Sequence, residues 1–98
     1  MSKFGDLINS HVPVLIDFYA GWSEPSAAMD TVVKEVASLL GADAKVIKID
    51  VDKNPELADA LRIKGLPTLV IYKDGQMIWR QSGEIDAATI VNLIKEQE

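Results

Sequence analysis

Two serines stand three positions apart where the sequence changes from a strand pattern to a helix pattern. Ser23 and Ser26 follow the apolar run 14–19 and enclose Glu24 and Pro25. A hydroxyl at this place can cap a helix, since Ser is a favoured first residue and Pro is tolerated in the first turn. The spacing is also that of a dithiol redox pair at a helix start, with oxygen in place of both sulfurs. A serine hydroxyl is barely ionised at neutral pH and forms no disulfide, so the chain as written cannot perform dithiol chemistry.

Asp17 is a second candidate for chemistry because it is a carboxylate inside an apolar run. Ile16 and Phe18 flank it, and burial at such a place disfavours the charged form and raises the pKa. The alternative is a solvated Asp that faces an edge of the sheet. Lys48 occupies the corresponding position of the next strand-like run. It either approaches Asp17 and offsets the cost of burial, or it is an ordinary exposed lysine, and both alternatives stay open.

The single histidine, His11, would complete the residue types of a hydrolase triad with Asp17 and a serine. The alternation of side chains along a strand argues against that grouping, and the chain contains no Gly-x-Ser-x-Gly turn. We therefore do not expect a hydrolase.

A calcium loop is excluded by two residues. Asp50, Asp52 and Asn54 have the spacing of its first ligands, but Pro55 stands where the loop needs glycine and Leu61 where it needs a bidentate Glu. With no cysteine and one histidine, the chain also lacks the side chains of a usual zinc or copper site. We expect no metal and no cofactor.

The composition fits one small soluble domain spanning residues 1–98. Apolar residues make up 48% of the chain and charged residues 26%, and no apolar stretch reaches the length of a membrane span. The formal net charge of -5 comes without a cluster of Lys and Arg, which argues against a nucleic-acid partner. Residues 1–6 lack the apolar core of a secretory signal, so we expect a cytoplasmic protein or one already trimmed.

Apolar periodicity alternates between extended and helical segments, which indicates an α/β fold. The run 12–19 is apolar on both faces, as in a central parallel strand. Gly41 is a helix stop, Asp74-Gly75 is a short hairpin signal, and Asp86 can cap the last helix. A right-handed crossover followed by a hairpin gives a mixed sheet of about four strands with helices on both faces. The expected elements are helix 4–10, strand 12–19, helix 25–40, strand 44–51, helix 54–61, strands 69–72 and 77–81, and helix 87–95.

With this order, the chain resembles the thioredoxin family over residues 12–97, in four separate blocks. The first is the run 14–22, which matches the strand leading into the family's active site. The second is Ser23-Glu24-Pro25-Ser26, which lies on the family's Cys-Gly-Pro-Cys. The third is the run 48–55, and the fourth is 63–69, which matches the segment holding the family's cis-proline. Four ordered blocks are more specific than one short motif.

The resemblance implies a role for each residue at the reacting centre. Ser23 takes the exposed nucleophile position and Ser26 the resolving position. Asp17 is implied to accept the proton of the resolving thiol, with Lys48 as its possible partner.

The resemblance also implies a docking surface. Pro67 is implied to be cis, which lets an extended substrate segment pair with the Leu66 backbone; the ordinary alternative is a trans-proline that opens an edge strand. For Trp22 the alternative to docking is packing in the core. The implied surface is apolar and shallow and consists of Trp22, Pro25, Leu66 and Gly83, with Glu24 beside it.

Two features depart from the family pattern. The family usually begins with an extra edge strand, for which the residues before Val12 are too few beside a helix, so we expect the strand 44–51 at an edge of the sheet. Glu24 replaces the small glycine between the two sulfur positions. Its charge would disfavour a thiolate at position 23, although it favours the helix start.

The activity implied by the resemblance is protein thiol-disulfide exchange. The implied partners are disulfide-containing proteins and a thioredoxin reductase-type electron donor, and we expect a monomer. The chain itself is then a redox-inactive Cys-to-Ser form that mimics the reduced state, and the loss of both sulfurs with the rest of the site kept favours deliberate substitution. The rival is a naturally redox-silent thioredoxin-like module that binds extended peptides or partner proteins.

Overall fold

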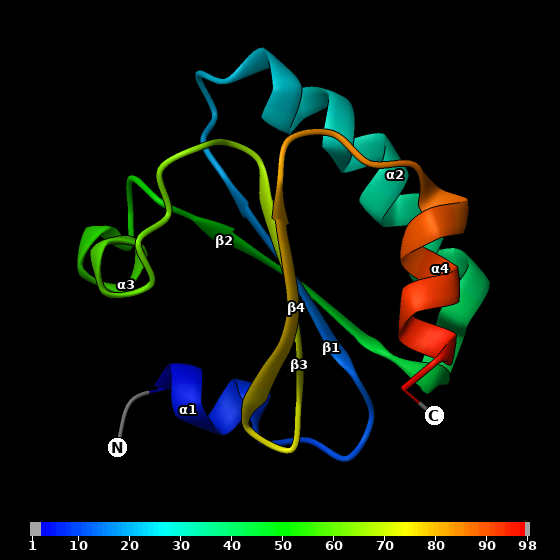
Figure 1. The fold of residues 1–98 in the computed structure, drawn as a ribbon. Coiled ribbons are helices and arrows are strands. Elements are labelled where there is room, and N and C mark those ends of the chain that lie inside the picture. Colours follow the sequence, from blue (N-terminus) through cyan, green and yellow to red (C-terminus); the bar gives the residue numbers. More distant parts are fainter. Residues whose placement is uncertain (1–2, 98) are drawn as a thin grey trace.

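The computed structural model describes residues 3–97 (Figure 1). Its elements follow the expected order, with one short 3-10 helix added after the longest helix. Residues 1–2 and 98 of the expected domain, and with them the start of the segment searched for a secretory signal, lie outside the described residues. The elements are α1 (Lys3–Ile8), β1 (Val14–Tyr19), α2 (Glu24–Leu40), η1 (Gly41–Asp43), β2 (Lys45–Asp50), α3 (Pro55–Ala60), β3 (Thr68–Lys73), β4 (Gln76–Ser82) and α4 (Ala87–Lys95).

The four strands form one mixed sheet in the order β2-β1-β3-β4. β1 pairs with β2 in parallel and with β3 antiparallel, so β1 is central, as its apolar sequence predicted. β2 lies at the edge of the sheet formed by residues 3–97, as expected. The register places Asp17 of β1 opposite Lys48 of β2.

β3 and β4 form a hairpin whose turn is Asp74-Gly75. Both residues have positive φ, 52° and 81°, which is the type I′ geometry that matches the twist of the strands. Glycine adopts such a φ without steric cost, which is why the pair signals this turn. The pairing shifts between Ile71 and Tyr72, which leaves Ile78 as the extra residue of a bulge.

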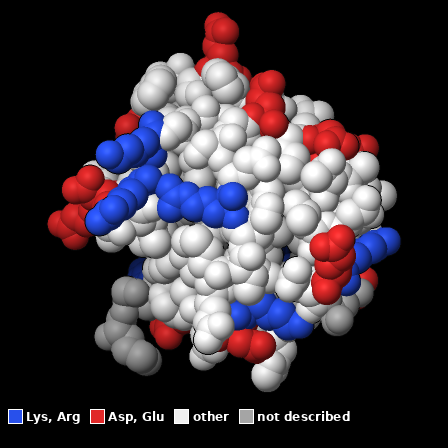
Figure 2. Space-filling view, in the orientation of Figure 1, with Lys and Arg blue, Asp and Glu red and all other residues white. Residues whose placement is uncertain are grey.

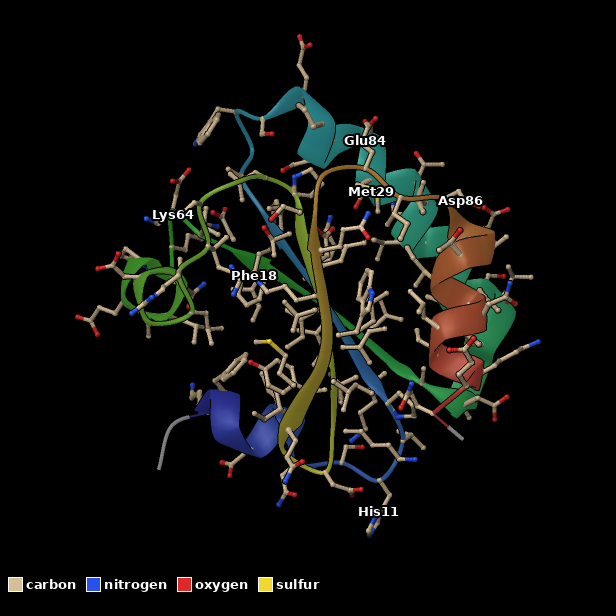
Figure 3. The ribbon with its side chains drawn as sticks, viewed as in Figure 1. His11, Phe18, Met29, Lys64, Glu84 and Asp86 are labelled. Atoms are coloured by element: carbon tan, nitrogen blue, oxygen red, sulfur yellow. The ribbon has the colours of Figure 1, made fainter. Side chains whose placement is uncertain are left out.

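Helices cover both faces of the sheet, and each face has its own apolar cluster. α2 and α4 lie on one side, and α1 and α3 lie on the other (Figure 1). Side chains alternate along β1, so Leu15 joins the cluster under α2 and α4, while Phe18 joins the cluster with α1 and α3. Figure 3 shows Phe18 and Met29 on opposite sides of the sheet.

α2 positions the site because one of its faces is anchored in the core. Its inward positions recur at helical spacing, and the helix ends at Gly41, whose φ of 53° suits glycine. The buried residues are Ser26, Met29, Val33, Val36 and Leu40. None of the helices built by residues 3–97 combines the length and the apolar character that a membrane crossing needs.

Candidate functional site

The first turn of α2 brings Ser23 and Ser26 together. Ser23 is the N-cap residue: its backbone is extended, and its hydroxyl accepts a hydrogen bond from the Ser26 amide at 3.3 Å. Glu24 and Pro25 occupy the first helical positions, where a carboxylate suits the helix dipole and Pro needs no amide partner. Ser23 therefore caps the helix, as its residue type suggested, and position 23 lies at the positive end of the helix dipole.

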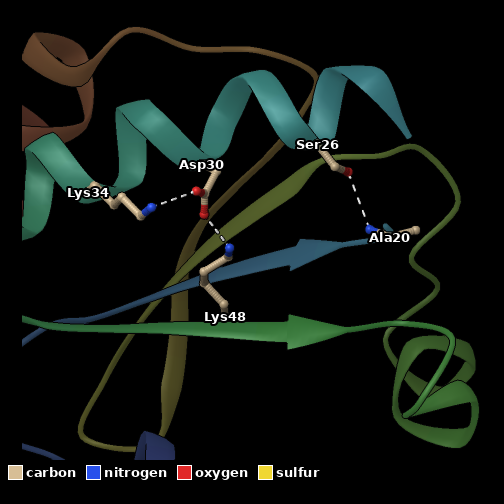
Figure 4. A network of polar contacts seen from close by, with 5 residues as sticks. All are labelled: Ala20, Ser26, Asp30, Lys34 and Lys48. Atoms are coloured by element: carbon tan, nitrogen blue, oxygen red, sulfur yellow. Dashed lines mark hydrogen bonds and ion pairs between the residues drawn. The ribbon is translucent and has the colours of Figure 1, made fainter. Parts of the chain in front are cut away.

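Both serines are buried, with 7% of Ser23 and 3% of Ser26 exposed. The Ser26 hydroxyl accepts a hydrogen bond from the Ala20 amide at 3.4 Å, which ties the start of α2 to the end of β1 (Figure 4). The expectation that Ser23 is exposed is wrong for this chain. The reason is the cap bond, because the Ser23 hydroxyl folds over the helix end to reach the Ser26 amide.

Asp17 is fully buried, and within residues 3–97 neither of its carboxylate oxygens has a hydrogen-bond partner. Burial raises the pKa of Asp17 from 3.8 to about 6; the positive charge of Lys48 opposes this shift and the negative charge of Asp30 adds to it. The solvated alternative for Asp17 is therefore wrong. A carboxyl with this pKa can exchange protons near neutral pH, which suits an acid-base role.

Lys48 bonds a different carboxylate from the one expected. Its ammonium contacts Asp30 on α2, and Lys34 lies 3.1 Å from the other oxygen of Asp30 (Figure 4). These bonds, first that from Lys48 and then that from Lys34, hold the pKa of Asp30 below its usual value, and the bond to Asp30 raises the pKa of Lys48. The Lys48 ammonium also lies 4.7 Å from the ring centre of Tyr19. Lys48 thus influences Asp17 through its charge, without a hydrogen bond to it.

The loop before β3 is fastened to the loop after β4. The Leu66–Pro67 peptide bond is cis, and the Pro67 carbonyl accepts a hydrogen bond from the Gly83 amide at 2.8 Å. The hydroxyls of Thr68 and Ser82 lie 3.0 Å apart. These bonds hold the backbone at Leu66 and Gly83 in one place.

Arg80 of β4 holds the other end of the same loop. Its guanidinium donates hydrogen bonds to the carbonyl of Leu61 at 2.5 Å and to the carbonyl of Arg62 at 2.7 Å. These carbonyls follow α3 directly, and Arg62 has a positive φ of 56°. The planar fork of Arg suits two neighbouring acceptors, so one side chain fixes the point where the chain leaves α3.

A shallow groove runs between these loops and the start of α2. Four of the six residues expected to bind substrate line it, namely Glu24, Pro25, Leu66 and Gly83, whereas Trp22 and Pro67 do not. Figure 3 shows Glu84 and Asp86 on the loop that leads to α4, and Glu84 lines the groove as well. Figure 2 shows carboxylates at the top and upper right of this view, while the Lys and Arg side chains lie on the left and in the lower half. The groove therefore carries negative charge on both sides.

Trp22 stands at the surface beside the two serines. Its side chain is 71% exposed, and its indole N–H donates a hydrogen bond to the Asp52 carboxylate at 2.9 Å. The core-packing alternative is therefore wrong. Because the bond uses the polar edge of the indole, the apolar face remains available for a partner.

The residues of the two excluded constellations make other contacts in the structure. His11 Nδ1 lies 3.0 Å from Asp74 at the hairpin turn, at the opposite end of the sheet from the start of α2 (Figure 3). Asp50 accepts the Asp52 amide at 2.9 Å with its carboxylate and the Asn54 side-chain amide at 2.9 Å with its carbonyl. Across residues 3–97, no three His, Cys, Asp or Glu side chains are grouped to hold a metal ion.

Comparison with known proteins agrees with this geometry. The family model described as Thioredoxin matches residues 1–96. The chain belongs to the thioredoxin family. A thioredoxin-like protein of Synechocystis sp. is 40% identical over 89 residues, which cover 91% of this chain and 85% of that protein. The thioredoxin of Mycobacterium tuberculosis strain H37Rv is 36% identical over 91 residues, which cover 93% of this chain and 78% of the relative.

Solved structures show the same fold. A mutant thioredoxin from Halobacterium salinarum NRC-1 superimposes with a TM-score of 0.88 at 36% identity, over 99% of this chain and 84% of that chain. Chloroplastic thioredoxin z superimposes with a TM-score of 0.86 at 33% identity, over 99% of this chain and 90% of that chain. The expected thioredoxin-like fold is confirmed.

Sequence reasoning missed three acidic residues of this thioredoxin site. Asp30 bonds Lys48, Asp52 bonds Trp22, and Glu84 lines the groove. The only signal for Asp30 was its position four residues after Ser26 and four before Lys34, which puts all three on one side of α2.

Proposed function

We propose that the chain is a thioredoxin-type module for thiol-disulfide exchange, held in a form that cannot react. The observation that carries the proposal is the meeting of Ser23 and Ser26 at the start of one helix, beside the groove that Leu66 lines. The buried Asp17 lies in the strand that leads to them. Because two hydroxyls form no bond with each other, the chain corresponds to the reduced state of a dithiol.

With thiols at both positions, exchange proceeds in two displacements. The thiolate at position 23, stabilised by the helix N-terminus, attacks one sulfur of a substrate disulfide, and the other substrate sulfur leaves as a thiolate. The thiol at position 26 then gives its proton to the Asp17 carboxylate and attacks the sulfur at position 23. That attack releases the first substrate sulfur as a thiolate. Two electrons pass to the substrate, and a disulfide between positions 23 and 26 remains.

The groove supports an extended polypeptide as the substrate. A segment lying between Pro25 and Leu66 can pair with the backbone at Leu66, and the exposed face of Trp22 can cover its side chains. Thioredoxins act on disulfide-containing proteins and take electrons from reductases. We assign partners of this kind to the active dithiol form, together with a monomeric state and a cytoplasmic location.

A redox-silent binding module is the second candidate, and the observation that favours it is the complete absence of cysteine. The groove and Trp22 serve such a module equally well, because peptide binding needs no thiol. The native gene separates the two candidates. Cysteine codons at positions 23 and 26 support the enzyme, and serine codons support the binding module.

The bench test restores the sulfurs with Ser23→Cys and Ser26→Cys together. We expect this variant to catalyse the reduction of insulin disulfides with thiol turnover. The matched control is Ser23→Cys alone, which can form a mixed disulfide but has no second thiol to resolve it. A double variant that is folded by circular dichroism and is no faster than this control would contradict the proposed exchange activity.

A further inference from the structure

Asp30 lies on α2 and connects this helix to the edge strand β2. It lies one helical turn after Ser26, so both side chains are on the same side of α2, and its carboxylate grips the Lys48 ammonium of β2 (Figure 4). Lys34, one turn further along, bonds the other oxygen of Asp30 at 3.1 Å. Asp30 is therefore anchored from its own helix while it holds a cation from the sheet.

Lys48 could serve Asp17 instead. The two residues are opposite each other in the parallel register, and both face α2, because Leu15 and Val46, two positions earlier in each strand, pack in the cluster under α2 and α4. The Asp17 oxygens nevertheless have no hydrogen-bond partner within residues 3–97. Lys48 interacts electrostatically with both Asp17 and Asp30, but its ion pair is with Asp30, the more exposed of the two.

We propose that Asp30 is a positioning residue that holds Lys48 away from the Asp17 carboxyl, and thereby keeps Asp17 a strong proton acceptor for position 26. The inference deepens the proposed exchange function and rests on it for its purpose. The arrangement of charges that it describes exists in the present chain and can be measured there without any thiol.

The charged groups around Asp17 come from two elements. β2 contributes Lys48, and α2 contributes Asp30 with Lys34 bound to its far side. On the other flank β3 places Leu69 opposite Asp17, which adds no charge. Removing the charge of Asp30 has two effects of the same sign: it ends a repulsion felt by the Asp17 carboxylate, and it frees Lys48 to approach that carboxylate.

The test is an NMR titration of the Asp17 side-chain carboxyl carbon in the present serine-containing chain. We expect Asp30→Asn to lower the pKa of Asp17 by roughly one unit, the size of shift that an approaching cation produces. Asp30→Glu keeps the charge and should leave the pKa close to that of the parent. Glu35→Gln is the matched control, since it removes the same charge from an exposed position on the same helix. Asp30→Asn with no larger effect than Glu35→Gln would overturn the proposal.

A second pair of variants shows whether Lys48 carries the effect. In a Lys48→Met background, Asp30→Asn can only remove the direct repulsion, so its shift should fall to less than half of that in the parent. An undiminished shift would mean that the two carboxylates interact directly, and the positioning role would be wrong.

The redox readout separates this inference from the proposed function. In the variant with Ser23→Cys and Ser26→Cys, adding Asp30→Asn should move the rising limb of the pH-activity profile to lower pH by the shift seen in NMR. An inactive dithiol variant that still shows the NMR shift would refute the proposed exchange activity and leave the arrangement of charges standing. If the dithiol variant is active, but Asp30→Asn changes neither the pKa of Asp17 measured by NMR nor the pH-activity profile, only the role of Asp30 is refuted.

Discussion

The two faces of the sheet are built from the same strands, but β1 presents different kinds of side chain to each of them. On the face that α1 and α3 cover, β1 presents Val14, Ile16 and Phe18, and all three are fully buried in an apolar cluster. On the face that α2 and α4 cover, the next positions are Leu15 and then Asp17, an equally buried carboxyl without a hydrogen-bond partner in residues 3–97. β1 thus presents only apolar side chains to α1 and α3, but presents a buried carboxyl to the face that α2 and α4 cover.

The difference shows which face of the sheet includes a residue whose burial costs stability. An apolar side chain gains free energy when it is buried, whereas a charged one loses it unless it is paired. The apolar side chains that β1 presents to α1 and α3 therefore stabilise the fold independently of pH. The face under α2 and α4 contributes less when Asp17 is ionised.

The largest effect should come from the apolar face. Phe18→Ala deletes a fully buried ring, and we expect it to lower the free energy of unfolding by about 4 kcal/mol, because the lost burial and the remaining cavity act together. Urea denaturation measures this loss. The control is Leu39→Ala, whose side chain is 64% exposed on α2 and which should change stability by less than about 0.5 kcal/mol. Equal losses at the two positions would show that the clusters do not carry the fold.

The next largest effect should come from Asp17 and should depend on pH. Its pKa is raised from 3.8 in the unfolded chain to about 6 in the fold, so between these values the folded state keeps a proton that the unfolded state has lost. Stability from this group is therefore highest below pH 4, falls as pH rises through 6, and is lower by about 3 kcal/mol at pH 8.

Asp17→Asn removes that titration and provides the measurement. Relative to the parent, the variant should gain about 2.5 kcal/mol in unfolding free energy between pH 4 and pH 8, with denaturation followed at both values. Comparing the two pH values cancels the constant cost of burying an amide. Asp43→Asn, an exposed change in η1, is the control. A difference between variant and parent that stays flat with pH would mean that Asp17 is not a titrating buried group.

A smaller effect should come from the cap at the mouth of the site. Ser23→Ala removes the hydroxyl that accepts the Ser26 amide, and we expect a loss of about 1 kcal/mol in unfolding free energy. Ser38→Ala, at an exposed position inside α2, should be neutral or slightly stabilising, because Ala is the better residue in a helix interior. Thermal denaturation of the two variants compares them directly, and a harmless Ser23→Ala would show that water replaces the cap.

Local sequence signals predicted most of the fold. The apolar run 12–19 identified the central strand, and Asp74-Gly75 identified the hairpin turn, because both depend on residues close together in the chain. The edge position of β2 followed from the family pattern together with the short segment before β1. The bulge at Ile78 did not follow, since it depends on how β4 meets β3.

The parts of the site that depend on residues close together in the sequence were predictable. Contacts between side chains on different elements were not. Ser23 and Ser26 share a helix start because they are three residues apart, and burial of Asp17 follows from its apolar neighbours. The partner of Lys48 was missed because two carboxylates on different elements compete for it. The helix cap of Ser23 was predicted from its residue type, but its burial was not, because the family resemblance implies an exposed side chain at this position.

Arg80 links the outermost strand β4 to the two carbonyls that end α3. The chain between those carbonyls and Pro67 is the loop that lines the groove, and the Pro67 carbonyl is bonded in turn just beyond β4, at Gly83. We therefore expect opening of the edge strand β4 and motion of the loop between Arg62 and Pro67 to occur together. A peptide that binds in the groove and restrains this loop should also restrain β4.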